Sequence, residues 1–408
     1  MSKLDDNYEV RGTGQEKLAC IVKDMDERTC VISVNAPQEL LISAVLEKHT
    51  NTESPRFVLL TSQTMVPGTL FPIKKEDLLH NRKYKNIGYI PQDSQTMDAL
   101  REYIPDIEQN GYYLVVRGER KVTIVPSKGF LATLCRRLNT GAIPPGENVF
   151  AFCYLATLLN KAEPFQIIAR KEAVNSTCYK GYHCASINFT AIPQAIVWNV
   201  KKLLEKHTKA KVWTWEITNY VTKVNFLFPE YSQKNENDTF MFGVRYQMST
   251  IGDCSLILQP IVKYRKSVFL YGKSKMITHR VKDENIKDIL DEAINCIMEQ
   301  IPSMIAKFWG VLEFSKQKLN KGSKICIKEL LKKADVKIGR KRQESLVAMC
   351  PDNLETLYEL FIWLIDKINN YPEKLPGYIQ NNFEEGIGRL FSLKPEVLGG
   401  FVDVGNVK

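Results

Sequence analysis

The chain has 408 residues, of which 44% are hydrophobic and 25% are charged, and its formal net charge is +10. These proportions are typical of folded globular proteins and exclude a wholly disordered chain. The sequence has no apolar run of about eighteen residues, so we expect no membrane span. Its polar first residues do not resemble a secretory signal, and we therefore expect a cytoplasmic protein.

The sequence contains no recognisable catalytic motif. Phosphate-binding glycine loops, a nucleophile-elbow serine and the HExxH zinc motif do not occur. Ten scattered cysteines without a C-x-x-C pair predict reduced thiols. Cys178, His183 and Cys184 are a poor zinc site because two of them are adjacent and a second ligand pair is missing. We expect no metal, no cofactor and no catalytic residue, and favour a binding protein over an enzyme. Carboxylates converging in one cleft would favour the enzyme.

Residues 1–126 are predicted to form an α+β region with hairpins. Strand-like composition predicts a hairpin between Cys20–Met25 and Thr29–Val34, and apolar spacing predicts a helix over Gln38–Lys48. A clearer hairpin is expected from Tyr112–Arg117 and Arg120–Val125, around Gly118-Glu119. The same patterns predict a strand at Arg56–Ser62 and a helix at Ser94–Ile104.

Residues 127–282 are predicted to form a central basic sheet domain. Three runs rich in β-branched and aromatic residues, separated by turn residues, predict an antiparallel β-meander. These runs are Asn219–Phe228, Phe240–Met248 and Ser255–Tyr264. In the second run, Phe240, Phe242, Val244, Tyr246 and Met248 share one face. Helices are expected at Ser127–Leu138, Asn148–Asn160 and Ile192–His207, and strands at Phe165–Lys171, Tyr182–Asn188 and Trp213–Thr218, with a βαβ-like unit around the third helix.

Residues 283–408 are predicted to be mostly helical. Apolar residues recur every three or four positions through Asp283–Leu319 and again through Leu354–Ile368. A last short helix is expected at Phe383–Phe391. Between them, Glu313–Arg342 holds eleven Lys and Arg against three acids. The predicted fold class is therefore α+β, an antiparallel β-meander packed on helices and followed by a mostly helical C-terminal part.

Positive charge is concentrated in one stretch of the sequence. Residues 199–282 hold 15 Lys and Arg against 6 Asp and Glu, and aromatic residues lie among them. Such a sheet can follow a phosphate backbone while bases stack on its rings. Alternatively, the rings lie in the core and the lysines only keep the outer face soluble. The candidate phosphate contacts are Lys223, Lys234, Arg245, Lys263, Arg265, Lys266, Lys273, Lys275 and Arg280, and the candidate stacking rings are Tyr246, Tyr264, Phe269 and Tyr271.

The segment MFGVRYQMSTIGDCSLILQPIVKYR carries a recognisable order of residues. With the strand EITNYVTKVNFLFPE before it and His279 after it, it resembles the phage and plasmid family known as domain of unknown function 932. The resemblance covers about residues 127–319. One departure is Lys266-Ser267-Val268, where the family has Cys-Asn-Gly. The matching positions are Ser186, Phe189, Ile192, Gly243, Ser249, Gly252, Ser255, Leu256, Pro260, Tyr264 and Arg265.

The resemblance implies a mobile genetic element, phage or plasmid, often near replication and recombination functions, and no cofactor. It also places the protein in the host cytoplasm if a phage encodes it. The expected meander braced by a long helix is similar in outline to phage single-strand annealing proteins. Together with the charge, this leads to the hypothesis of a non-enzymatic protein that binds single-stranded DNA in annealing, recombination or replication. The alternative is a protein-interaction or self-assembling mobile-element protein, for example a counter-defence factor, that does not bind nucleic acid and uses its C-terminal amphipathic helices. Such a protein could form a homo-oligomer.

Overall fold

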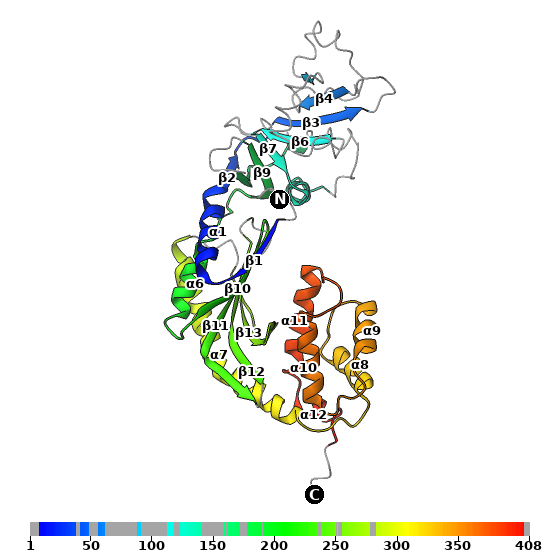
Figure 1. The fold of residues 1–408 in the computed structure, drawn as a ribbon. Coiled ribbons are helices and arrows are strands. Elements are labelled where there is room, and N and C mark those ends of the chain that lie inside the picture. Colours follow the sequence, from blue (N-terminus) through cyan, green and yellow to red (C-terminus); the bar gives the residue numbers. More distant parts are fainter. Residues whose placement is uncertain are drawn as a thin grey trace.

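The computed structural model shows an α+β protein with two sheets and a helical C-terminal part, as the sequence predicts (Figure 1). One sheet lies beyond the other along the length of the molecule, and the C-terminal helices lie beside the lower sheet of the view. The residues that the structure describes are 8–37, 41–48, 56–61, 88–90, 112–117, 123–140, 158–159, 161–171, 178–189, 191–235, 238–249, 251, 255–277 and 283–403.

The central sheet is the predicted meander with additional strands at both edges. Its order is β1-β10-β11-β12-β13-β14, and β15 also pairs with β13. All of these pairs are antiparallel. The strands are β1 (Glu9–Thr13), β10 (Lys211–Thr218), β11 (Thr222–Asn235), β12 (Asp238–Met248), β13 (Leu256–Tyr264), β14 (Ser267–Leu270) and β15 (Lys275–Ile277). The strand β1 therefore comes from the start of the described chain, far in sequence from β10, with which it pairs.

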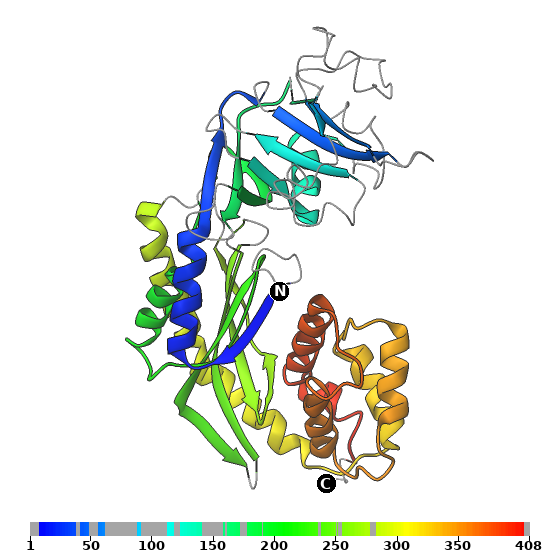
Figure 2. The same ribbon diagram turned by 45° about the horizontal axis from the view of Figure 1, so that its top comes forward.

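One face of the central sheet is packed against helices, and this determines which residues of its regular strands point inward. The helices are α1 (Gln15–Arg28), α6 (Ile196–Leu204) and α7 (Asp283–Ser315). In both ribbon views α1 and α6 lie on this side of the sheet (Figures 1 and 2). The predicted alternation along β12 is confirmed, since Phe240, Phe242, Val244, Tyr246 and Met248 are all buried in the main core. Residues at the intervening positions consequently point to the other face.

The second sheet has the order β2-β8-β9-β7-β6-β3-β4-β5. Its strands are β2 (Thr29–Val34), β3 (Leu41–Lys48), β4 (Arg56–Thr61), β5 (Gly88–Ile90), β6 (Tyr112–Arg117), β7 (Thr123–Pro126), β8 (Phe165–Lys171) and β9 (Cys178–Ser186). Helix α4 (Lys128–Arg137) packs on it through Phe130 and Leu134. The two sheets do not follow the predicted boundary at residue 126. Strands β8 and β9 come after this boundary but belong to the second sheet, and β1 comes before it but belongs to the central sheet.

Several local predictions are confirmed in the second sheet and around it. The hairpin of β6 and β7 forms, with Val116 opposite Ile124. Ser127 caps α4 by accepting a hydrogen bond from the backbone N–H of Phe130 at 3.3 Å. The predicted helix at Ser94–Ile104, and most of that at Asn148–Asn160, lie outside the described residues.

Three local predictions are wrong. The run Cys20–Met25 is part of helix α1, where Leu18, Val22 and Met25 are buried at helical spacing. The run predicted as a helix from Gln38 instead contains β3, which is flanked by β4 and β6, so strand pairing outweighs local propensity. The βαβ-like unit does not exist because β9 and β10 belong to different sheets.

The C-terminal helices lie on the side of the central sheet opposite α1 and α6 (Figures 1 and 2). They are α8 (Ser323–Lys333), α9 (Arg340–Met349), α10 (Leu357–Lys367), α11 (Gly377–Leu390) and α12 (Pro395–Leu398). Thr356 and Glu359 form a capping box at the start of α10. The Phe391 ring, after α11, lies 5.3 Å from Phe269 of β14 and 4.6 Å from Phe308 of α7. This ring joins the helices to the main core.

Candidate functional site

The second face of the central sheet carries rows of polar side chains. Residues directly opposite on neighbouring strands lie on the same face, with Cβ atoms about 4.5–5.5 Å apart. We call this surface the polar face. One row runs Arg11, Glu216, Lys223 and Gln247 across β1, β10, β11 and β12. The next row runs Thr13, Thr214, Asn225, Arg245 and Gln259 across β1, β10, β11, β12 and β13. The first row alternates in charge, which stabilises neighbouring strands.

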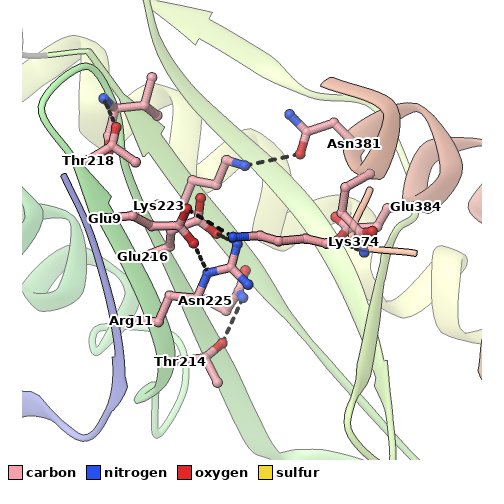
Figure 3. A network of polar contacts seen from close by, with 12 residues as sticks. Glu9, Arg11, Thr214, Glu216, Thr218, Lys223, Asn225, Lys374, Asn381 and Glu384 are labelled. Carbon is pink, nitrogen blue, oxygen red and sulfur yellow. Dashed lines mark hydrogen bonds and ion pairs between the residues drawn. The ribbon is translucent and has the colours of Figure 1, made fainter. Parts of the chain in front are cut away.

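A cleft of about 650 Å³ separates the polar face from the C-terminal helices. Its sheet wall contains both rows near β1, β10, β11 and β12, together with Trp213, Lys266 and Val268. Its helical wall consists of residues between Ile368 and Glu384, from the end of α10 into α11. Figure 3 shows the polar side chains that meet across this space. The site is therefore built from the first described strand, the meander and the last long helix.

Arg245 and Glu384 form a buried ion pair across the cleft. Their side chains are 7% and 10% exposed, and an Nη of Arg245 contacts the carboxylate of Glu384. Arg245 Nε also donates to Asn225 Oδ1 at 2.9 Å, and Gln380 Nε2 donates to Glu384 Oε1 at 3.3 Å. A buried charge is tolerated when it is paired and hydrogen-bonded. This pair accordingly holds α11 on the sheet, and Arg245 is not an open phosphate contact.

Lys223 is a different kind of cation. Its ammonium donates to the amide oxygen of Asn381 at 3.1 Å, across the cleft (Figure 3). Burial lowers the pKa of Lys223, and the nearby carboxylate of Glu216 partly offsets this effect. Because its hydrogen-bond partner across the cleft is a neutral amide, an anion entering the cleft would find a desolvated positive charge there.

The mouth of the cleft has exposed cations beside aromatic rings. Arg11 pairs with Glu9 at 2.6 Å and with Glu216 at 3.3 Å, and its side chain is 60% exposed. Lys374 is 78% exposed and lies 3.5 Å from Glu9. Lys266 is also exposed at the sheet wall, and the partly buried rings of Trp213 and Tyr371 line the same space. The Lys263 ammonium lies 5.0 Å from the centre of the Trp213 ring.

The structure corrects the predicted stacking surface. The rings of Tyr246, Tyr264, Phe269 and Tyr271 are at most 4% exposed and lie in the main core. They occupy the helix-covered side of the sheet, or the junction with α7, so bases cannot reach them. Tyr264 additionally donates its hydroxyl to Asp238 at 2.6 Å, and this bond fixes the end of the meander. The interpretation of these rings as core residues is therefore the correct one.

The predicted phosphate contacts are split into several groups. Lys223, Arg245 and Lys266 line the cleft, and Lys263 lies over Trp213 beside it. Arg265 pairs with Asp238 at 3.3 Å. Lys234 is exposed near the far end of β11, Lys273 and Lys275 follow β14, and Arg280 lies outside the described residues. The cations are thus not spread over one continuous sheet surface.

Sequence reasoning missed the residues of the helical wall, and it also missed Arg11 and Trp213 on the sheet wall. Arg11 had a local signal, because Glu9, Arg11 and Thr13 alternate with Val10 and Gly12 in a strand. The sequence predicts Trp213 as the first residue of a strand and gives no signal that its ring lines a cleft. Lys374 and Tyr371 lie in a segment without secondary structure between α10 and α11, and only the fold brings them to the sheet.

No family model, curated protein or solved structure matches the chain. The resemblance to family 932 consequently rests only on the order of residues between about residues 127 and 319. Across the described ranges, no group of three or more His, Cys, Asp and Glu could hold a metal ion. In the same ranges, no helix is long and apolar enough to cross a bilayer.

Proposed function

We propose that the protein binds single-stranded nucleic acid in the cleft between the polar face and α11. The observation that carries this proposal is the mouth of the cleft, where Arg11, Lys266 and Lys374 lie with the rings of Trp213 and Tyr371. Proteins that bind single strands combine a cationic groove for the phosphates with aromatic rings for the bases. The two requirements occur together at this place in the fold.

The rings favour a single strand over a duplex. In a duplex the flat faces of the bases are stacked on one another, whereas an unpaired base can leave the stack and lie on a side chain. Trp213 and Tyr371 line the cleft from opposite walls, one on the sheet and one after α10. Base stacking on such rings contributes about 1–3 kcal/mol per base and depends little on sequence. We therefore expect binding without strong sequence preference.

Acidic residues at the mouth set the strength of binding. Glu9 contacts both Arg11 and Lys374, and Glu216 contacts Arg11. A phosphate must replace these carboxylates, and exposed ion pairs of this kind contribute only about 0–1 kcal/mol each. Exchange is consequently feasible, and affinity should depend strongly on salt because every contacted phosphate releases counterions.

The proposed role is binding rather than turnover, in the replication or recombination of a mobile element. Support for the biological setting comes from the resemblance of the meander to family 932, and support for binding comes from the cleft. A site that contacts the phosphate backbone and stacks on bases of any sequence is compatible with the annealing of complementary strands.

The test is a salt titration of binding to a fluorescent oligothymidine, followed by anisotropy. Lys266→Ala and Lys374→Ala should each weaken binding and reduce the slope of log K against log salt by about 0.7. Lys202→Ala is the control, since Lys202 is exposed on α6 on the other side of the sheet. An affinity that does not change with salt concentration, or an equal loss of affinity in all three variants, would overturn the proposal.

A further inference from the structure

Helices α8 and α9 carry a concentration of positive charge that the cleft does not use. The segment Glu313–Arg342 holds eleven Lys and Arg against three acids. None of its residues lines the cleft. In both ribbon views α8 and α9 lie on the far side of α11 from the central sheet (Figures 1 and 2). The charge is therefore on a separate, outward surface.

The cations of α8 form a stripe. Lys324, Lys328 and Lys332 are four residues apart, so they lie above one another on one side of the helix, with a rise of about 6 Å between neighbours. This spacing is shorter than the Debye length of about 8 Å at physiological salt, so their fields add. The other side of α8 is in the core, where Cys326, Ile327, Leu330 and Leu331 are buried.

The first turn of α9 carries three further cations. Arg340, Lys341 and Arg342 form its first turn, which has no acidic residue and no side-chain cap at Gly339. Cations at the start of a helix face the positive end of the helix dipole, so this arrangement opposes helix stability. A surface that served only solubility would mix both signs of charge. A local departure of this kind from the charges that stabilise a helix is typical of a functional surface.

Neighbouring acids neutralise only part of this surface. Lys324 lies 2.8 Å from Asp352, and Arg340 lies 2.8 Å from Glu344 with its own side chain 92% exposed. Exposed ion pairs of this kind are weak, so a phosphate can replace the carboxylate. Lys328, Lys332, Lys333 and Lys341 are exposed, and no acid within the described chain forms an ion pair with them.

We propose that α8 and the first turn of α9 form a docking surface for the phosphate backbone of double-stranded DNA. A duplex presents one negative charge for about every 1.7 Å of its axis, which matches a dense and extended set of cations. The segment from Lys316 to Cys350 contains no Phe, Tyr or Trp, so it offers no ring for an unpaired base. Ile325 is the one large apolar side chain exposed on α8 among the described residues, which disfavours a lipid surface.

This surface goes beyond the proposed function and does not depend on it. If both sites are occupied, the protein holds a single strand in the cleft and a duplex on α8 and α9. The nucleic acid that fits this arrangement is a junction between paired and unpaired regions.

The test compares two triple variants of the full chain with equal loss of charge. Lys328→Ala/Lys332→Ala/Lys333→Ala removes two lysines of the stripe and the neighbouring exposed Lys333, whereas Lys17→Ala/Lys202→Ala/Lys287→Ala removes exposed lysines from α1, α6 and α7. Both are titrated by anisotropy against a labelled duplex of mixed sequence and against oligothymidine over a series of salt concentrations. Circular dichroism checks that both remain folded.

The first variant should lose at least tenfold in duplex affinity and about 0.9 in salt slope for each lysine that contacts a phosphate. Its affinity for oligothymidine should stay close to that of the unmodified protein, and the second variant should keep both. Absence of duplex binding by the unmodified protein would overturn the inference. So would equal loss of duplex binding in the two variants, or loss of oligothymidine binding in the first.

Discussion

Gly388 in α11 lies directly against the backbone carbonyl of Leu270 in β14. A Cβ atom at position 388 would come within 1.5 Å of that carbonyl oxygen and 2.7 Å of the carbonyl carbon. Helix backbone and strand backbone therefore touch with no side chain between them. The contact sets how closely α11 approaches the sheet, and α11 forms the helical wall of the cleft. Glycine at this position thus determines the width of the proposed binding site.

Gly388→Ala should destabilise the protein because a methyl group cannot enter without moving α11 away from β14. Overpacking of this kind costs about 1–3 kcal/mol. The loss should appear as a lower midpoint in urea denaturation. Gly310→Ala is the control, since nothing lies within 4 Å of a Cβ at that position in α7. The control should be neutral or stabilising by about 0.4–1 kcal/mol. Equal midpoints for the two variants would contradict the backbone contact.

Glu384→Gln should destabilise the attachment of α11 because it leaves the buried guanidinium of Arg245 without its counter-charge. Removal of one partner of a buried pair costs on the order of 3–5 kcal/mol. The amide of the new glutamine can still accept a hydrogen bond from Arg245, so we expect a loss near the lower end of this range. Urea denaturation measures the loss.

The double variant Arg245→Met/Glu384→Leu should recover most of that stability, because apolar residues replace both charges at once. If the double variant lost as much stability as Arg245→Met and Glu384→Leu lose together when each is measured alone, the pair would not be energetically coupled.

Affinity for a single strand should fall as pH rises toward alkaline values, and Lys223 is the reason. Phosphate binds its ammonium form, and burial lowers the pKa of Lys223 from the ordinary value of 10.5. Lys223 therefore loses its charge at a lower pH than exposed lysines, and binding weakens with that loss. Lys223→Arg keeps a positive charge over the same range and should remove the decline. Anisotropy at constant ionic strength between about pH 7 and pH 10 measures both curves. Parallel curves would exclude Lys223 from the site.

Thiol labelling should separate the cysteines by their surroundings. Cys20 is exposed on α1, whereas Cys184 is buried in β9 and burial raises its pKa. Burial also raises the pKa of Cys30 to about 11. Because the thiolate is the reactive form, Cys20 should react with a maleimide first, and Cys30 and Cys184 should react after unfolding. Peptide mass spectrometry against time of labelling measures the order, and early labelling of Cys184 would contradict the position of α4 on β9.

The meander was predictable because its signals are local. Alternation from Phe240 to Met248 fixes the strand, and the same alternation places Arg245 on the polar face. The same alternation places Tyr246 on the buried face. The prediction that bases stack on its ring was therefore inconsistent with the predicted strand. Adjacent residues of a strand point to opposite faces, so Tyr246 and Arg245 cannot belong to one binding surface.

The cleft was not predictable in the same way because it depends on contacts between distant parts of the chain. Glu384 lies on α11, and nothing near it in the sequence points to Arg245. Arg11 reaches the site only because β1 pairs with β10. Likewise, β3 is a strand because β4 and β6 flank it, although the local spacing favours a helix. Long-range strand pairing can therefore override a local preference for a helix.

Ultraviolet cross-linking of a bound oligothymidine, followed by mass spectrometry of the linked peptides, tests the proposed site most directly. The account predicts that the linked residues are Trp213 and Tyr371, on the two walls of the cleft. Cross-links confined to the helix-covered side of the sheet, around α1 and α6, would contradict it.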